Sequence, residues 1–526
     1  MVYNLVLPTA IAVGLSILSL YKYFIYPVFI SPLSKIPSAH FSAPVSPAWI
    51  LWNRFRMRGN RTIHKAHQKY GPIVRLGPSE ISVNCIDGGI RTVYAGGFEK
   101  HDWYPRVFGA YGTLSMFSMV GTKPHSVRKR MMSNIYSKSY LQSSPHMATI
   151  SQAIIYRRLL PILQRNARFQ SNVEVHELNN AITMDFVSAY IFGLASGTNF
   201  LEDVSAGREW FRVYQSRKPF EFFHQEVPNM TSLARMLKIP LIPKWCEKAN
   251  QDMEDWGLEM IDNAEKFIAS TNPACEPIVY KQVKQSMLKQ LAKDGLEANA
   301  GVLSQQRLEL ACEMYDHLTA GHETSAVALT YLYWELSRHP DLQVELRKEL
   351  DTLSPRIMAQ SVPGIPTELP HPKDIDALPL LNAIIMETLR LHSPIPGIQP
   401  RITPAPHTTL AGYDQIPPKT RVNAQAYSLH RNHDVFPNPE SFLPHRWLEP
   451  KDSVDLENMR RWFWAFGSGG RMCVGSNLAL QEMKLVVAAI YSNFTSKIVD
   501  DEGIEPIDAY TVRPSSNKLV LKFELV

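Results

Sequence analysis

The first thirty residues contain a run that is longer and more apolar than the helices of ordinary soluble proteins. Residues 2–21 include no charged side chain. As an α-helix, such a run extends about 30 Å, the thickness of the hydrocarbon core of a bilayer. Lys22 interrupts it, and residues 23–30 are again apolar. We therefore predict a membrane anchor at residues 1–30 and one folded body at residues 31–526.

The charges beside this run predict which side of the membrane holds the body. No basic residue precedes the run, whereas eight follow it closely: Lys22, Lys35, Arg54, Arg56, Arg58, Arg61, Lys65 and Lys69. The positive-inside rule then places the body in the cytoplasm. A cleaved signal peptide fits less well, because it needs a basic start and a small-residue cleavage site. A buried helix of a soluble protein is the other alternative.

Cysteine content and charge exclude several classes of protein. The five cysteines are scattered and include no C-x-x-C pair, which argues against a disulfide scaffold or a cysteine-rich zinc module and favours a reducing compartment. The net charge of +6 comes from 55 basic and 49 acidic residues that are interleaved. This balance suits a membrane surface or an acidic protein partner, and we expect no nucleic-acid partner.

Hydrophobic periodicity predicts a mainly α body with small peripheral β-sheets. Helical spacing dominates residues 125–393, with long helices expected at 304–339 and 378–392. Strand-like segments are short and lie at 73–76, 80–83 and 519–523. Proline and glycine are dense between residues 355 and 372, which predicts a surface loop.

Some familiar catalytic motifs are incomplete. His322 and Glu323 begin an H-E-x-x-H zinc motif, but Ala326 stands at its last position. The glycines near Gly467 do not complete G-x-G-x-x-G, since Met472 replaces the third glycine. Neither a G-x-S-x-G elbow nor a Walker A loop is present. Hydrolase and dinucleotide-binding functions therefore lose their main support.

A glycine-rich loop ending in a cysteine is the strongest chemical signal. Gly467, Gly469 and Gly470 closely precede Cys473, and a helical run begins at Ser476. The glycines allow a tight turn and close approach to a flat partner, and a helix N-terminus favours a thiolate. A shielded thiolate in such a loop is what an axial ligand of haem iron requires.

This segment resembles the haem-binding loop of the cytochrome P450 family, F-x-x-G-x-R-x-C-x-G. All fixed positions are met, by Phe466, Gly469, Arg471, Cys473 and Gly475. The resemblance implies the cytochrome P450 fold behind an N-terminal transmembrane helix. It also implies a haem cofactor, with Cys473 as the iron ligand and the other four residues in contact with the cofactor or shaping its loop.

Three more motifs follow the family's order. Glu387 and Arg390 form E-x-x-R on one helix face, and Arg446 lies in an element that looks like the family's P-x-R-[FW]. The resemblance implies a structural cluster in which one carboxylate holds both guanidinium groups. Upstream, residues 320–324 are similar to the A-G-x-[DE]-T motif, which implies that Glu323 and Thr324 are catalytic and handle protons during oxygen activation.

Weaker correspondences concern the haem propionates. His125 and Lys129 lie where the family has W-x-x-x-R, although the tryptophan and the arginine are both replaced. Arg401 occupies the place of another propionate-binding arginine. Arg128 and Arg130 are expected to be solvated charges, and with Lys129, Arg460 and Arg461 they are candidates for docking an acidic reductase surface.

The resemblance implies a haem-thiolate monooxygenase, an oxidoreductase that uses O2 to oxidise an apolar small molecule. Its electrons are expected from a membrane-bound NADPH-dependent flavoprotein reductase. The anchor is most similar to fungal members of the endoplasmic-reticulum membrane, single-pass with a cytoplasmic catalytic domain, and suggests secondary-metabolite biosynthesis. Two alternatives remain: a reductase-independent peroxide isomerase or dehydratase of the same fold, and a haem-binding protein or sensor without catalysis.

Overall fold

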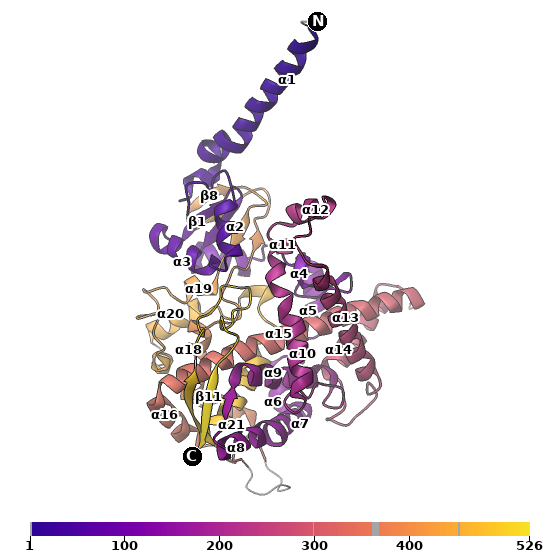
Figure 1. Ribbon diagram of the computed structural model, residues 1–526, viewed down its shortest axis with the longest axis vertical. Coiled ribbons are helices and arrows are strands. Elements are labelled where there is room, and N and C mark those ends of the chain that lie inside the picture. The colour runs from indigo at the N-terminus through magenta and orange to yellow at the C-terminus, as the bar shows by residue number, and fades with distance from the viewer. Residues whose placement is uncertain (1–2, 298, 360–367, 451–452) are drawn as a thin grey trace.

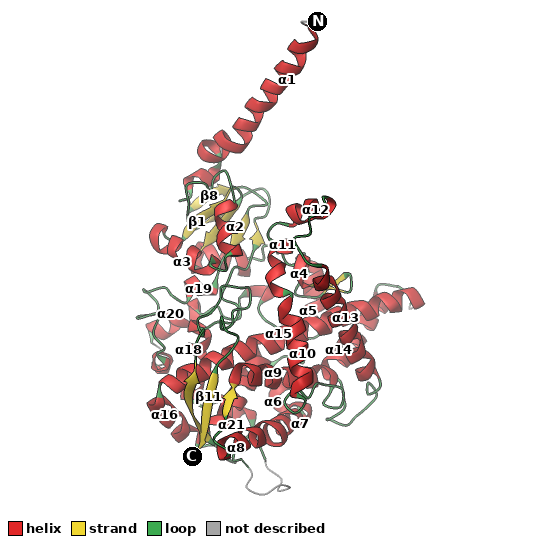
Figure 2. Cartoon of the chain, viewed as in Figure 1, coloured by secondary structure: helices red, strands yellow, loops and turns green. Residues whose placement is uncertain are grey.

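The computed structural model describes residues 3–297, 299–359, 368–450 and 453–526. Helices dominate the body, and the strands lie at its periphery, as the periodicity predicts (Figure 2). The first thirteen helices are α1 (Tyr3–Leu20), α2 (Ala48–Phe55), α3 (Gly59–Tyr70), α4 (Pro105–Phe108), α5 (Thr122–Arg130), α6 (Lys138–Ser143), α7 (Pro145–Gln152), α8 (Leu160–Arg168), α9 (Val175–Phe192), α10 (Val204–Ser216), α11 (Glu221–Gln225), α12 (Pro228–Met236) and α13 (Lys244–Glu265). The later ones are α14 (Ile278–Lys293), α15 (Ala300–Arg338), α16 (Pro340–Leu350), α17 (Pro372–Asp376), α18 (Pro379–Leu391), α19 (Ala426–Leu429), α20 (Val454–Trp462) and α21 (Ser476–Tyr491).

The described strands form four small sheets. Their bounds are β1 (Ile73–Gly77), β2 (Glu80–Val83), β3 (Gly109–Ala110), β4 (Thr113–Leu114), β5 (Asn172–Glu174), β6 (Arg401–Ile402), β7 (Thr408–Leu410), β8 (Tyr413–Ile416), β9 (Arg421–Asn423), β10 (Phe494–Asp500) and β11 (Val520–Leu525). The sheet orders are β1-β2-β9-β6, β10-β11-β5, β3-β4 and β7-β8. All three strand-like segments read from the sequence are therefore strands, although the last begins and ends later than predicted.

The N-terminal span projects away from the body (Figure 1). Helix α1 continues into the π-helix η1 (Tyr21–Ile30), so Lys22 does not end the helical segment. Among the described residues, one helix, Pro8–Ile30, is long and apolar enough to cross a membrane. Its junction with the body is fixed by Arg75 of β1, which is fully buried and donates to the Pro27 carbonyl oxygen at 2.8 Å.

Two long helices form the centre of the main core. Helix α15 crosses the body (Figure 1) and packs against α9, which is buried along almost its whole length. Asn299 caps the start of α15 by accepting from the Val302 amide at 3.0 Å, and Pro340 starts the next helix. The observed α15 and α18 match the predicted helices at 304–339 and 378–392 to within a few residues. Of the surface loop predicted at 355–372, residues 360–367 lie outside the described residues.

A buried charge cluster joins α11 to the four-stranded sheet. Glu226, just after α11, accepts from Arg54 at 3.0 Å, from Arg421 at 3.0 and 3.1 Å, and from the Trp103 indole at 3.0 Å. Glu80 on β2 pairs with the same two arginines. Burial alone raises the pKa of Glu226, but the charges of Arg421 and Arg54 and the hydrogen bonds outweigh burial and lower it to about 2.

We expect Glu226→Gln to lower the free energy of unfolding by about 3 kcal/mol at pH 7, since it leaves buried guanidinium charge uncompensated. The folded pKa lies below the ordinary value near 4.5, so this contribution is present above pH 4.5 and is lost as the pH falls toward 2. Urea unfolding of both proteins at pH 7 and pH 3 measures the difference, which should shrink at pH 3. Glu209→Gln, which breaks an exposed pair with Arg212, should change little at either pH. A Glu226 effect that is independent of pH would contradict the assignment.

Candidate active site

The loop before α21 is shaped by its glycines and by close backbone contacts. Gly469 has a φ of +71°, and a Cβ there would lie 2.3 Å from the Tyr94 carbonyl oxygen, so no larger residue fits. The Cys473 amide donates to the Phe466 carbonyl oxygen at 3.0 Å. Lys129 of α5 donates to the carbonyl oxygens of residues 470 and 472 at 3.0 and 2.8 Å. The loop is thus closed on itself and fastened to α5.

Cys473 faces a large cavity inside the body. The cavity has a volume of about 720 Å³, and its lining includes Phe466, Arg471 and Gly475 of the same loop. Burial raises the pKa of the Cys473 thiol, whereas the amides of Gly475 and Ser476 and the charge of Lys129 oppose this rise. The helix start therefore favours the thiolate, as the sequence predicts, but in this structure burial has the larger effect.

Four groups that can carry positive charge gather at one side of this cavity: Lys100, His125, Arg401 and Arg471. Lys100, His125 and Arg401 are buried. Burial, together with the charges of Arg401 and Arg471, lowers the pKa of Lys100 well below its ordinary value. Burial and the neighbouring charges of Arg471 and Lys100 lower that of His125 to about 3. The four groups thus destabilise one another's charged forms.

The partners of the four groups are neutral. Lys100 donates to the Phe117 carbonyl oxygen, and Arg471 donates to the carbonyl oxygens of residues 119 and 120 at 2.7 and 2.6 Å. Arg401 donates to the Tyr104 hydroxyl and the Pro400 carbonyl oxygen, both at 3.0 Å. None of the four forms an ion pair with a described residue. Basic groups that lack a carboxylate partner among the described residues are suited to an anionic ligand, whose charge would favour their protonated forms.

The middle of α15 forms another wall of the cavity. A Cβ on Gly321 would lie 2.5 Å from Val187 Cγ2, so this glycine permits the close packing of α15 on α9. Thr324 lines the cavity and donates to the Ala320 carbonyl oxygen at 2.9 Å. Glu323 pairs with Lys218 of η5 (Lys218–Phe220) and accepts from the Tyr214 hydroxyl at 3.2 Å. Adjacent residues of a helix project about 100° apart, and the acid and the alcohol have separate partners.

Glu387, Arg390 and Arg446 form one cluster, in which the Glu387–Arg390 pair follows from spacing and Arg446 from the family resemblance. Arg390 bonds both oxygens of Glu387 at 2.8 Å, and Arg446 bonds one of them at 3.2 Å. The Trp447 indole and the Leu443 amide each add a bond at 2.9 Å.

His430 links this cluster to the cysteine loop. Its two ring nitrogens bond the Arg390 carbonyl oxygen at 2.9 Å and the Trp464 amide at 2.8 Å. The Trp464 indole then donates to the Ser468 hydroxyl at 2.9 Å. No local pattern indicates a role for His430, because its partners lie at distant positions of the chain.

The structure differs from the sequence reading at two basic residues of α5. Arg128 is not solvated: it is buried and pairs with Glu309 at 2.8 Å and Glu313 at 3.4 Å. It therefore cannot form part of an exposed docking surface, whereas Arg130, Arg460 and Arg461 are exposed. Lys129 bonds the cysteine loop and does not line the cavity, in contrast to its predicted contact with a propionate.

Two lysines that the sequence reading missed belong to this site, Lys100 and Lys218. Lys100 lies in a stretch rich in aromatic residues, 98–121, and this local composition was the available signal in the sequence. The structure shows that Lys100 is buried. Lys218 belongs to a segment more than 100 positions from its partner Glu323, and no local pattern joins them.

Comparisons with known proteins agree with this architecture. The cytochrome P450 family model matches residues 43–521. The cytochrome P450 monooxygenase avaI of Aspergillus versicolor is 29% identical, covering 80% of this chain and 94% of its own. The monooxygenase sdnE of Sordaria araneosa is 29% identical and covers 93% and 92%. The fusicoccadiene C-8 hydroxylase of Alternaria brassicicola is 25% identical and covers 92% and 89%.

A mainly helical body whose cysteine loop opens on a cation-lined cavity is the architecture of a haem-thiolate oxidoreductase. The chain belongs to the cytochrome P450 family. That family implies a haem, and the residues present fit one. The basic groups without ion-pair partners suit its two carboxylates, Cys473 supplies a thiol, and the glycine at 469 keeps the loop close to the η3 segment (Ile86–Ala95).

Proposed function

We propose that this protein is a haem-thiolate monooxygenase that hydroxylates or otherwise oxidises an apolar organic substrate. The observation that carries this function is that three features open on one cavity: the Cys473 thiol, the four basic groups that form no ion pair with a described residue, and Thr324 of α15. The first two suit a haem, and the third places an alcohol in the space where dioxygen and substrate would meet. The peroxide isomerase and the non-catalytic haem protein are the functions that an experiment has to separate from it.

Several residues would hold the cofactor. Cys473 is the proposed iron ligand, while Arg471, Arg401, His125 and Lys100, which line the same cavity, would bind the haem carboxylates. When bound, the haem supplies dioxygen activation. Gly469 and Gly475 keep the loop compact, and Phe466 lines the cavity beside the thiol. Lys129 holds the loop through its carbonyl oxygens and acts as a positioning residue.

Glu323 and Thr324 are the proposed proton-handling groups. The Thr324 hydroxyl borders the cavity, where it can hold a proton or an ordered water near the reacting atoms. The charge of Lys218 and the Tyr214 hydrogen bond help to lower the pKa of Glu323, against the opposing effect of burial. The lowered pKa favours an ionised Glu323, whose side chain bonds Lys218 and Tyr214.

The N-terminal span, the exposed basic residues and the fungal relatives suggest a cellular location, an electron donor and a biological role. The span at Pro8–Ile30 would anchor it in the endoplasmic-reticulum membrane with the catalytic domain in the cytoplasm. A membrane-bound NADPH-dependent flavoprotein reductase would dock on exposed basic residues such as Arg130 and Arg460. The fungal relatives, one of them named a fusicoccadiene hydroxylase, support a role in secondary-metabolite biosynthesis.

Turnover of 7-ethoxycoumarin under 18O2 tests this function. The holoprotein with reductase and NADPH should give an oxidised product that depends on both, with 18O incorporated when oxidation is a hydroxylation.

Thr324→Ala should release several times more hydrogen peroxide per NADPH, because the alcohol no longer directs protons. Thr324→Ser should behave as wild type. Conversion of a fatty-acid hydroperoxide without NADPH would favour the isomerase. Haem binding without either product would favour the non-catalytic protein.

A further inference from the structure

Asp316 is a cavity carboxylate that the proposed chemistry does not use. It lies on α15 four residues before Ala320, on the helix face that borders the cavity. The Ser115 hydroxyl bonds its side chain, but Asp316 forms no ion pair with any described residue. A carboxylate in a largely apolar space is costly unless a donor or a cation compensates it.

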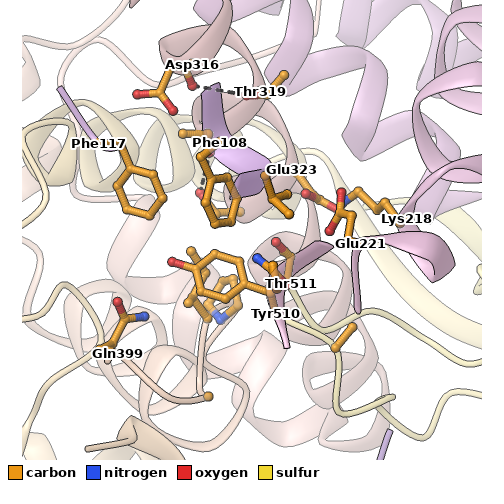
Figure 3. A pocket seen from close by; sticks show the side chains of 18 of the residues that line it. Phe108, Phe117, Lys218, Glu221, Asp316, Thr319, Glu323, Gln399, Tyr510 and Thr511 are labelled. Atoms are coloured by element: carbon orange, nitrogen blue, oxygen red, sulfur yellow. Dashed lines mark hydrogen bonds and ion pairs between the residues drawn. The ribbon is translucent and has the colours of Figure 1, made fainter. Parts of the chain in front are cut away.

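Three aromatic rings lie beside this carboxylate. Figure 3 shows Asp316 above Phe108 and Phe117, with Tyr510 across from them. The ring centroids of Phe108 lie 5.0 Å from Phe117 and 5.1 Å from Tyr510, and the other pair is 6.5 Å apart. These rings come from α4, the segment after β4 and the C-terminal loop, so they form one continuous aromatic wall. Aromatic faces attract cations, most strongly where water is excluded.

Lys100, the lysine whose charge acts on Asp316, forms no ion pair with it. Lys100 donates to the Phe117 carbonyl oxygen and lies 4.0 Å from the Phe117 ring centroid and 4.2 Å from that of Tyr104. Burial, together with Glu313, raises the pKa of Asp316 to about 7, against the lowering effects of His317, Lys100 and Ser115. A bound cation would favour the ionised carboxylate, and the aromatic wall would shield the pair from water.

We propose that the cavity selects substrates that carry a basic nitrogen, whose ammonium group is held by Asp316 against Phe108, Phe117 and Tyr510. This rests on the proposed function only in taking the cavity as the substrate site. The apolar remainder of the substrate lies in the part of the cavity that the haem would leave free. Asp316 is then a specificity-determining residue: it fixes one end of the molecule and thereby decides which carbon lies near Thr324.

A pair of isosteric probes tests the proposal. (1-Naphthylmethyl)trimethylammonium carries a fixed positive charge, and 1-neopentylnaphthalene has the same shape with carbon in place of nitrogen. Neither has a nitrogen lone pair, so neither can bind iron. Calorimetric titration of the holoprotein should show about tenfold tighter binding of the cation. In Asp316→Asn this preference should fall to within about twofold, while the affinity for the neutral probe is unchanged.

Glu221→Gln is the matched control, because Glu221 lines the same cavity and also forms no ion pair with a described residue. It should keep the preference for the cation. The proposal is overturned if wild type shows no preference, if Asp316→Asn retains it, or if Glu221→Gln loses it. The carbon-monoxide spectrum of each sample reports the haem separately. A sample without the thiolate band would contradict the proposed function, whereas the titration reports on Asp316 alone.

Discussion

Glu387→Gln is expected to destabilise the protein by about 3–5 kcal/mol, because it leaves the buried Arg390 guanidinium without its counter-charge. Both residues are fully buried, so water cannot replace the lost interaction. Arg390 keeps its bonds to the carbonyl oxygens of His430, Pro439 and Ser441, but these are neutral. Urea unfolding at pH 7, followed by circular dichroism, measures the loss.

The same variant should also loosen the cysteine loop. His430 joins Arg390 to Trp464, and Trp464 bonds Ser468 of the loop. We therefore expect Glu387→Gln to release haem faster than wild type to an excess of apomyoglobin. Glu345→Gln is the control, since it breaks an exposed pair with His445 and should cost less than about 1 kcal/mol. Equal stability of the two variants would contradict the structural role of Glu387.

Local sequence patterns were sufficient to predict those parts of the protein whose interacting residues lie close together in the chain. The apolar span, the helices α15 and α18 and the glycine-rich loop are each determined by spacing within twenty or so residues. Glu387 and Arg390 are three positions apart on one helix, and their pair could be predicted from that spacing alone. Arg446 lies 56 positions beyond Arg390, and it could be added only through the order of motifs in the resembling family.

Contacts between distant segments could not be predicted in this way. Arg128 reads as a surface charge within a basic run, but the packing of α5 on α15 brings it to Glu309 and Glu313. Lys218 reads as an ordinary lysine before a proline, yet it pairs with Glu323 in the cavity wall. Lys129 carries the charge expected at its position but reaches the loop carbonyl oxygens. In each case the tertiary packing of a helix, not its own sequence, determines what the charge contacts.

Cys473→Ser is expected to abolish the red-shifted Soret band of the reduced carbon-monoxide complex and to reduce monooxygenase turnover below detection. An alcohol remains protonated where a thiol can ionise, so serine cannot supply the electron-rich ligand. The fold should survive, because the loop is held by the Cys473 amide, the glycine turns and Lys129, none of which involves the sulfur. An unchanged thermal midpoint of the haem-free proteins would show that the spectral loss is not unfolding.

A control substitution at a second cysteine, Cys312, tests whether the loss of the Soret band is specific to Cys473. Cys312 also lines the cavity, on α15, where its Sγ lies 3.7 Å from the Thr113 carbonyl oxygen, and burial raises its pKa to about 12. It lacks both the glycine loop and the helix N-terminus that surround Cys473, so Cys312→Ser should keep the Soret band. If the band persists in Cys473→Ser and disappears in Cys312→Ser, the ligand assignment is wrong. Because both variants exchange sulfur for oxygen in the same cavity, only the position of the thiol distinguishes them.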